Sequence, residues 1–316
     1  TASGNTGLGK DALESNTTGD NNVAVGGFAM NSNTTGTANT AIGQEALDSN
    51  TTASGNTAVG RHALGANTTG AENDAFGFVA LASNTTGGNN CAFGAGALDA
   101  NTTASNNSAF GRDALGANTT GGTCTAVGTE ALKRNTTGHD NTCIGYRAGQ
   151  YIQSSGRENT IVGGLAGDSL TTGVNNVCIG YDSEPSSSTS NNSVTLGNQY
   201  TTDLRCNDTS ISSLSDQRDK TEIIDLPIGL DFINAVRPVK FKWASRDGKQ
   251  GKDGTYEAGF IAQEFQAVET ATSVDYLRLV LADNPDKLEA APNKLFPVLV
   301  KAIQELSAKV TALEAG

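Results

Sequence analysis

A serine and a lysine five positions apart, Ser215 and Lys220, are the residues of this 316-residue chain whose types best fit catalysis. A serine hydroxyl attacks as a nucleophile when a base removes its proton. A lysine amine can be that base if burial or neighbouring cations push its pKa toward neutrality. The histidines, His62 and His139, lie in repeats far before the serine, which argues against a Ser-His-Asp arrangement. A serine assisted by a lysine is therefore the chemistry that this pair could perform if the two side chains meet.

The spacing of the pair does not by itself bring the two side chains together. Five positions separate side chains by about 140° on a helix and place them on opposite faces of a strand. A turn, or a second chain, must therefore position Ser215 against Lys220. The same stretch also fits the start of a helix, because Ser or Asp followed by charged residues is common there.

Composition changes at Ser215 and divides the chain into two parts. Residues 1–214 are rich in Gly, Asn and Thr and carry 8 basic and 17 acidic side chains, whereas residues 215–316 carry 13 and 16 and resemble ordinary globular sequence. An acidic chain has no sequence-independent attraction for nucleic acid or anionic lipid. We find no run of about 18 apolar residues and no signal-peptide pattern, so we expect neither nucleic-acid binding nor membrane insertion.

Residues 1–197 repeat with a period of 17 residues. A glycine series starting at Gly9 keeps this period and, after a one-residue slip, resumes at Gly163, Gly180 and Gly197, which gives about twelve repeats. The tripeptide Asn-Thr-Thr recurs eight times in step with it, at Asn16, Asn33, Asn50, Asn67, Asn84, Asn101, Asn118 and Asn135.

Each repeat has too few large apolar side chains for a core of its own, so successive repeats must stack. A helical hairpin is excluded by the central glycine and the Asn-Thr-Thr-Gly break. Short strands fit better, with glycines at the corners and asparagine amides bonding the turn above. Stacking would align two apolar series: Val25, Ile42, Val59, Phe76, Phe93, Phe110 and Val127, and Leu13, Met30, Leu47, Leu64, Leu81, Leu98, Leu115 and Leu132.

The repeat Asn-x-Ala-(Val/Ile)-Gly-x-x-Ala, as in Asn39-Thr40-Ala41-Ile42-Gly43, resembles the left-handed parallel β-rolls of trimeric autotransporter adhesin heads and the shafts of phage tail fibres. The resemblance covers about residues 1–200 and implies that three chains wrap one axis. A ladder this thin also needs a partner to cover its apolar edges. We therefore expect a mainly β fold: a parallel β-roll or β-helix of about twelve repeats in a homotrimer.

Other features of the repeats have structural explanations beside functional ones. Asn-Thr-Thr fits the N-glycosylation sequon, although a repeated structural turn explains its even spacing. Acidic residues near the corners indicate a solvated face, and no Gly-Gly-x-Gly-x-Asp calcium motif occurs, so we expect no metal and no cofactor. Five cysteines are interpreted as buried thiols and not as a disulfide framework: Cys91, Cys124, Cys143, Cys178 and Cys206.

The end of the array leads into a linker. Residues 183–190, Ser-Glu-Pro-Ser-Ser-Ser-Thr-Ser, predict a loop inside the last repeat interval. Residues 198–214 predict an extended linker in which residues 210–213 are exposed and accessible to proteolysis.

A second resemblance begins at the junction. The pattern Ser215-Asp216-x-Arg218-x-Lys220-x-x-Ile223 resembles the opening signature of the C-terminal intramolecular chaperone domain of phage tailspikes, endosialidases and tail fibres, a self-cleaving peptidase family. Two further motifs stand in the family's order, Arg-Pro-Val-Lys-Phe-Lys-Trp at 237–243 and Gly-Phe-Ile-Ala-Gln-Glu at 259–264, and Leu-Val-Lys-Ala-Ile-Gln-Glu-Leu at 299–306 resembles the family's closing helix.

The resemblance implies that the chain cuts itself between Leu214 and Ser215, with Ser215 as nucleophile and Lys220 as base. The ester formed on the serine would then be hydrolysed by water. The residues expected to support the pair are Asp216 and Arg218, which would pin the loop by ion pairing, and Glu264, which would orient the pair.

The last stretch of the chain predicts a helix over about 294–315. Its apolar residues follow the 3-4 spacing of a coiled-coil seam. The seam spans under three heptads, too short for a stable coiled coil alone, and the helix could instead pack on its own domain. The trimeric shaft favours the coiled coil, at the end of a small α+β chaperone domain over 215–316. The seam residues are Phe296, Leu299, Ile303, Leu306, Val310 and Leu313.

Together these features predict a viral tail fibre or spike protein whose C-terminal domain drives trimer assembly and cleaves before Ser215, with no external substrate. Such a protein would be assembled in the host cytoplasm, reside in the virion and meet a host surface receptor or glycan. The alternative is a cell-surface trimeric adhesin, or a glycosylated extracellular fibre, with a non-cleaving trimerisation domain.

Overall fold

The computed structural model describes residues 2–201, 203–205, 215–244, 254–282, 284–286 and 288–316. The chain folds as two compact units, residues 1–198 and residues 199–316. Leu214, Cys206 and the predicted exposed segment 210–213 lie outside the described residues.

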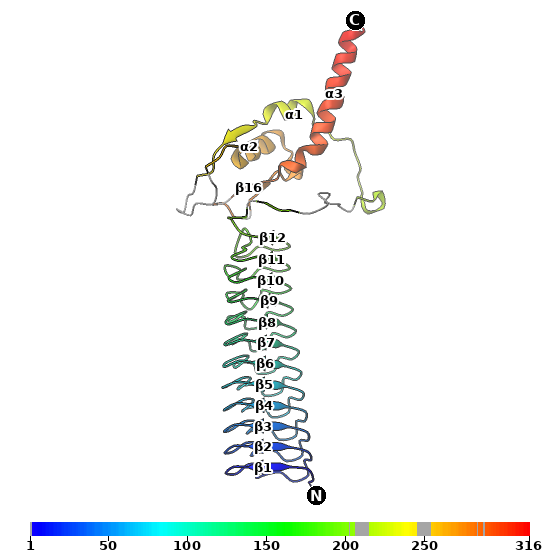
Figure 1. Cartoon of the computed structure of the whole chain (residues 1–316). Helices are drawn as coiled ribbons and strands as arrows, with labels where there is room; N and C mark the ends of the chain where they lie inside the picture. The colour runs from blue at the N-terminus through cyan, green and yellow to red at the C-terminus, as the bar shows by residue number, and fades with distance from the viewer. Residues whose placement is uncertain (1, 202, 206–214, 245–253, 283, 287) are drawn as a thin grey trace. The chain divides into compact units, whose positions relative to one another are not determined.

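The first unit, called the shaft below, is a parallel β-solenoid in which each repeat makes one turn (Figure 1). Its strands are three residues long and pair in chain order, and equivalent residues pair in register, as Ile42 does with Val59. The predicted stack of about twelve repeats is therefore confirmed. The strands are β1 (Thr6–Leu8), β2 (Val23–Val25), β3 (Thr40–Ile42), β4 (Thr57–Val59), β5 (Asp74–Phe76), β6 (Cys91–Phe93), β7 (Ser108–Phe110), β8 (Thr125–Val127), β9 (Thr142–Ile144), β10 (Thr160–Val162), β11 (Val177–Ile179) and β12 (Val194–Leu196).

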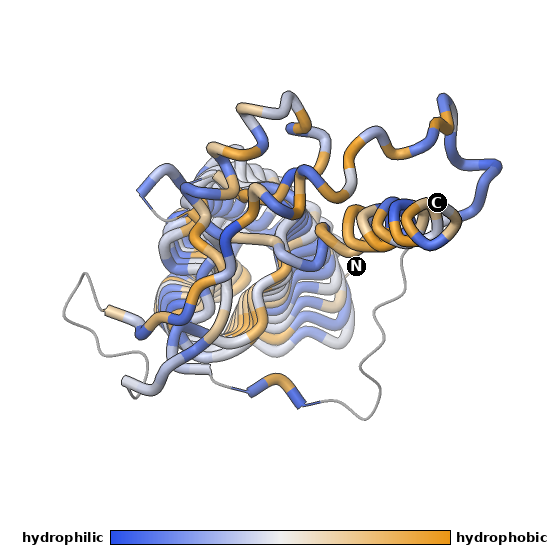
Figure 2. Tube along the Cα trace, turned by 90° about the horizontal axis from the view of Figure 1, so that it is seen from above, coloured by the Kyte–Doolittle hydropathy of each residue, from blue (hydrophilic) through white to orange (hydrophobic). Residues whose placement is uncertain are grey.

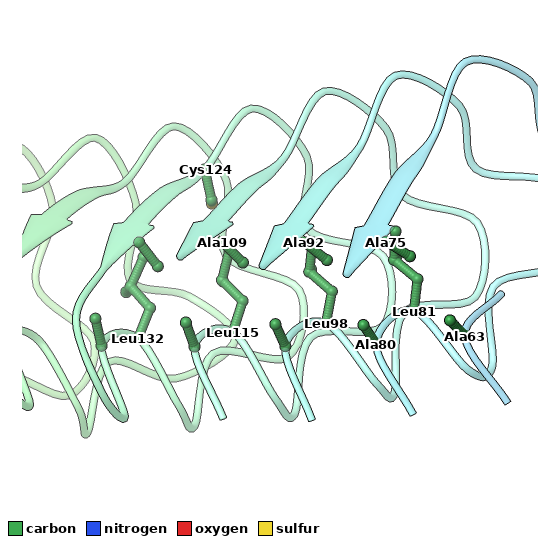
Figure 3. Close-up of a cluster of buried hydrophobic side chains, with 14 of the residues drawn as sticks. Ala63, Ala75, Ala80, Leu81, Ala92, Leu98, Ala109, Leu115, Cys124 and Leu132 are labelled. Carbon is green, nitrogen blue, oxygen red and sulfur yellow. The ribbon is translucent and has the colours of Figure 1, made fainter. Parts of the chain in front are cut away.

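Columns of alanine and leucine fill the interior of the solenoid (Figure 3). The middle residue of a three-residue strand points to the opposite side from its two neighbours. This middle residue is alanine in most turns, and Ala92 and Ala109 are fully buried. The leucine series is buried beside it, as Leu98 and Leu115 show. Small side chains thus let a narrow turn close around an apolar core.

The Val/Ile/Phe series stacks as predicted, but on the outer face of the strands. Ile42 is 42% exposed and Phe93 is 37% exposed. Each of these residues follows an inward-pointing alanine, so its own side chain must point outward. The alanine column lines the interior instead, which the sequence reasoning missed. Seen along the stack, residues of like hydropathy superpose from turn to turn (Figure 2).

Two rows of buried asparagines bond each turn to the next. Asn84 donates through Nδ2 to Asn67 Oδ1 over 2.8 Å and to the carbonyl oxygen of Gly87 over 2.9 Å. Asn101 donates in turn to Asn84 Oδ1 over 2.9 Å. The predicted hydrogen bonds between asparagine side chains of successive turns are thus present. The second row, which the sequence reasoning did not separate, is Asn22, Asn39, Asn56, Asn73, Asn90, Asn107, Asn141, Asn159 and Asn176.

The burial of the first row decides the question of glycosylation. Seven of the eight Asn-Thr-Thr asparagines are fully buried, and Nδ2 of Asn84 already donates two hydrogen bonds. A glycan on Nδ2 would remove a donor and would need space that the packed interior does not have. Glycans at these seven positions are incompatible with the folded shaft.

The corner glycines adopt the backbone conformation that the repeats predicted. Gly43 has φ of +138°, and a Cβ built on it would lie 2.5 Å from the carbonyl oxygen of Gly60 in the next turn. Side-chain-bearing residues rarely adopt this φ, and the contact leaves no room for a methyl group. Glycine is therefore required at this corner.

The cysteines of the shaft are free thiols, in agreement with the sequence-based interpretation. Cys124, Cys143 and Cys178 are buried and Cys91 is half-buried. Burial raises the pKa of the Cys124 and Cys178 thiols to about 11 and raises the pKa of Cys143 well above its usual value. These thiols are therefore unreactive packing groups in the folded shaft.

The second unit is small and mixes helices with two short antiparallel sheets, β13 with β14 and β15 with β16. This agrees with the predicted α+β region. Its elements are η1 (Gln217–Asp219), α1 (Leu230–Ala235), β13 (Val239–Phe241), β14 (Glu257–Gly259), α2 (Ala262–Thr272), η2 (Asp275–Leu277), β15 (Val280–Leu281), β16 (Glu289–Ala290), η3 (Pro292–Leu295) and α3 (Phe296–Glu314). Its core consists of Phe232, Phe265, Val274, Leu277, Leu279, Leu295 and Val298.

Helix α3 is the predicted C-terminal helix, and it packs on its own unit through a face other than the predicted seam. Val298 is fully buried and Ala302 is 5% exposed. Glu305 accepts a hydrogen bond from the backbone nitrogen of Leu230 over 2.8 Å and so ties α3 to α1. The seam faces outward, with Ile303 66% exposed. The helix thus packs on its own domain, as the alternative to the coiled coil supposed, but the predicted seam stays exposed in the single chain.

Candidate functional site

A tight turn brings Ser215 and Lys220 together. The short 3-10 helix η1 lies between them and is closed by a hydrogen bond from the Lys220 backbone nitrogen to the Gln217 carbonyl oxygen over 3.1 Å. Lys220 Nζ then lies 2.6 Å from Ser215 Oγ and 3.3 Å from the Ser215 carbonyl oxygen. The turn that the five-residue spacing requires is present within one chain.

An ion pair between Asp216 and Arg218 holds this turn. Arg218 Nε donates to both carboxylate oxygens of Asp216, over 3.0 and 3.1 Å, and Arg218 Nη2 lies 2.6 Å from Oδ2. Asp216 also caps η1 by accepting from the Arg218 backbone nitrogen over 2.9 Å. Hydrogen bonding to the guanidinium lowers the pKa of Asp216 and raises the pKa of Arg218. Both groups therefore stay ionised near neutral pH and serve the shape of the turn.

The pair is open to solvent in the single chain. Ser215 and Lys220 are both exposed. A lysine becomes a general base when it loses its proton, which burial in an apolar environment or nearby cations favour. The chain by itself thus brings the Ser215 hydroxyl and the Lys220 amine into contact but does not bury the amine.

Glu264 is bonded elsewhere than the sequence reasoning expected. It lies in the first turn of α2 and pairs with Arg237, whose Nε lies 3.0 Å from Oε2 and whose Nη2 donates to Oε1. The pairing lowers the pKa of Glu264 and raises the pKa of Arg237. Among the described residues, Glu264 makes no hydrogen bond to Ser215 or Lys220. In the single chain it joins two of the family-like motifs.

Two further carboxylates bind backbone groups and were missed by the sequence reasoning. Glu269 is 8% exposed and accepts a hydrogen bond from the Leu279 backbone nitrogen over 2.7 Å. Glu305 does the same for Leu230. Such contacts join residues 10 and 75 positions apart, and no local pattern in the sequence marks them.

Both histidines lie in the shaft, where His62 pairs with Glu45 and His139 with Asp140. No three His, Cys, Asp or Glu side chains in the described ranges are grouped so that they could hold a metal ion. No helix in the same ranges has the length and apolar character needed to cross a bilayer.

The fold defines a class, a parallel β-solenoid followed by a small α+β unit with a C-terminal helix. Within it, residues 215–274 match the family model described as chaperone of endosialidase, and the match begins at Ser215 itself. The chain thus contains a chaperone-of-endosialidase domain at this position. No curated protein and no solved structure matches the chain.

Proposed function

We propose that this chain is a structural protein of a viral tail fibre or tailspike, whose C-terminal domain assembles three copies and then cuts the Leu214–Ser215 bond. One observation carries the proposal: the chaperone-of-endosialidase match begins at Ser215, and the turn there places Lys220 Nζ 2.6 Å from Ser215 Oγ. The virion, with a host surface receptor or glycan as partner, is the setting that this proposal implies.

The repetitive shaft gives a physical reason for an assembly domain. Turns of nearly identical sequence can pair out of register by one repeat at little cost, because the alternative pairings bury similar groups. A domain that brings three chain ends together fixes their alignment. The outward seam of α3, with Leu299 41% and Leu306 50% exposed, supplies an apolar surface through which three helices can associate.

The proposed cleavage uses one serine as nucleophile and as the residue that carries the leaving amine. Ser215 Oγ attacks the Leu214 carbonyl carbon while Lys220 takes the hydroxyl proton. The Leu214–Ser215 carbon–nitrogen bond breaks, and Lys220 returns the proton to the departing Ser215 nitrogen. Water then hydrolyses the ester, which leaves a carboxylate on Leu214 and free hydroxyl and amine groups on Ser215.

Assembly would provide the activation that the single chain lacks. Packing of neighbouring copies around the exposed turn would desolvate Lys220 and favour its neutral form. Cleavage would then follow correct assembly, and the separated shaft could not return along the same path.

The test is expression of the full chain as wild type and as Ser215→Ala, Lys220→Met and Ser213→Ala. Wild type and the matched control Ser213→Ala should yield two fragments with a new N-terminus at Ser215. Ser215→Ala and Lys220→Met should stay intact. Hydroxylamine added during cleavage should convert the ester to a hydroxamate on Leu214.

Light scattering on the same samples separates assembly from cleavage. A trimer that stays uncut in the wild type would refute the peptidase and leave the assembly domain standing. A monomer would refute the assembly proposal. An intact trimer carrying hexose mass increments would instead favour the extracellular adhesin. Such increments would contradict the conclusion that the buried asparagines carry no glycans.

A further inference from the structure

The outer face of the solenoid sheet is unusually poor in charge for an acidic shaft. Each strand of β1–β12 presents its first and third residues on this face, and Asp74 is the one charged residue among them. The third residues are all apolar. We call this column the outer stripe: Leu8, Val25, Ile42, Val59, Phe76, Phe93, Phe110, Val127, Ile144, Val162, Ile179 and Leu196.

Three consecutive phenylalanines form the bulkiest part of the outer stripe. The ring centroids of Phe76 and Phe93 lie 4.4 Å apart with an interplanar angle of 10°. Those of Phe93 and Phe110 lie 5.2 Å apart at 7°. We call these residues the aromatic block. Smaller side chains, Val59 and Val127, border it on either side.

The outer stripe is large enough for a stable interface. Ile42, Phe110, Ile144 and Ile179 are between 39% and 43% exposed. Twelve side chains of this kind offer on the order of 800 Å² per copy, about what each partner buries in a standard interface. Apolar patches of this size on soluble proteins mark interaction surfaces.

The period of the outer stripe identifies its partner. Apolar side chains recur at the spacing of paired strands, about 4.8 Å, over all twelve turns. A surface that fits such a row along its whole length must repeat at the same step, and another copy of this chain does so. An unrelated globular partner would match only a few turns.

We propose that copies of this chain pack against one another along the outer stripe, and that the aromatic block sets their axial register. The inference rests on the proposed trimeric assembly and assigns its contact surface in the shaft. A slip of one turn would place Phe110 of one copy opposite Val127 of the next, and Val59 opposite Phe76. Ring against valine leaves a gap at one end of the block and crowding at the other.

The first test locates the surface. A photo-cross-linking benzoylphenylalanine replaces Phe93 in the full chain, or replaces Phe78 as the matched control. Phe78 is 53% exposed two positions after the stripe residue Phe76, but it lies at a corner and outside the outer stripe. Irradiation should give chain-to-chain adducts from position 93 at least tenfold above those from position 78. Adducts from 78 in equal or greater yield would overturn the assigned surface.

The second test addresses register. The photo-cross-linker replaces Ile144, and adduct peptides are mapped by mass spectrometry in the wild-type sequence and in Phe76→Val/Phe93→Val/Phe110→Val. In the wild-type sequence the cross-link from position 144 should reach the same turn of the neighbouring copy. The triple variant keeps an apolar stripe, but at least about a third of its adducts should reach a turn of the neighbouring copy that is shifted by one repeat. Adducts that stay on one turn in the triple variant would overturn the role of the aromatic block.

Light scattering of each sample distinguishes the two levels of proposal. A monomeric wild type would refute the proposed assembly itself. A trimer whose adducts avoid the outer stripe would refute only the outer stripe as the contact surface between copies.

Discussion

Lys220 Nζ lies 2.6 Å from Ser215 Oγ although the two residues are five positions apart and lie in neither an α-helix nor a β-strand. The contact depends on a single 3-10 turn. Side chains on Asp216 and Arg218 hold that turn, and the proposed cleavage should therefore be sensitive to them.

Asp216→Ala should slow self-cleavage. The substitution removes the cap of η1 and the ion pair to Arg218, and loss of alignment between nucleophile and base typically costs roughly ten- to a hundredfold in rate. The measurement is the cleaved fraction against time on a gel. Asp216→Asn keeps an acceptor for the cap and should restore part of the rate, and Asp219→Asn, in the same turn, should cleave normally. Wild-type cleavage by Asp216→Ala would show that the ion pair does not position the dyad.

Gly26→Ala should destabilise the shaft far more than Gly27→Ala. Gly26 has φ of +135°, and a Cβ there would lie 2.5 Å from the Gly43 carbonyl oxygen, whereas a Cβ on Gly27 would meet nothing within 4 Å. We expect a loss of at least about 2 kcal/mol for Gly26→Ala. Amide exchange in β2 and β3 measures it locally, and apparent melting temperature measures it for the shaft. Equal behaviour of the two variants would refute the corner geometry.

Glu130→Gln should flatten the acid dependence of shaft stability. Hydrogen bonds from Lys133 and then Arg147 lower the Glu130 pKa from its ordinary 4.5 to about 2. Because the folded pKa is depressed, the stabilisation is complete above pH 4.5 and is lost as the pH falls toward 2. Melting temperatures at pH 7, 4.5, 3 and 2 should therefore converge for wild type and variant at low pH. Glu72→Gln, at an exposed carboxylate, is the control, and a gap that stays constant from pH 7 to 2 would contradict the assignment.

Opposite faces of α3 should respond differently to a charge. Val298→Asp places a carboxylate in the core and should unfold the second unit, at a cost of at least about 3 kcal/mol. Ile303→Asp adds it to the exposed seam and should leave the fold intact while abolishing association. Circular dichroism and light scattering separate these outcomes, with Gln304→Asp as the exposed control. Full association of Ile303→Asp would rule out the seam as a contact between copies.

Much of the shaft could be predicted from its sequence because equivalent positions in successive turns have the same backbone geometry and therefore require the same residue type. Gly43 meets a corner that excludes a side chain, and the Asn84 amide can both donate and accept along the stack. The alanine column was missed because three-residue strands are too short to show alternation. Leu47 has φ of 51°, a conformation that leucine rarely adopts and that burial of its side chain enforces here.

The sequence predicted which residue types form the candidate site, but it did not predict which contacts the surrounding residues make. Serine and lysine at a sharp change of composition identify a possible dyad. The Glu264 partner, by contrast, is an arginine 27 positions away. The sequence alone cannot show whether Glu264 contacts Ser215 and Lys220 or links two motifs, because its partner depends on how β13 and α2 pack together.

The first asparagine row gives the shaft an electrical direction. From Asn33 to Asn135 each amide donates an N–H to the asparagine of the preceding turn, and from Asn16 to Asn118 each amide oxygen accepts from the following one, so the dipoles add along the row and each hydrogen bond polarises the next. The row ends at Asn135, whose Oδ1 has no hydrogen-bond partner among the described residues. The positive pole of this row therefore lies toward the N-terminal turns, and its negative pole is a single buried oxygen eight turns into the shaft.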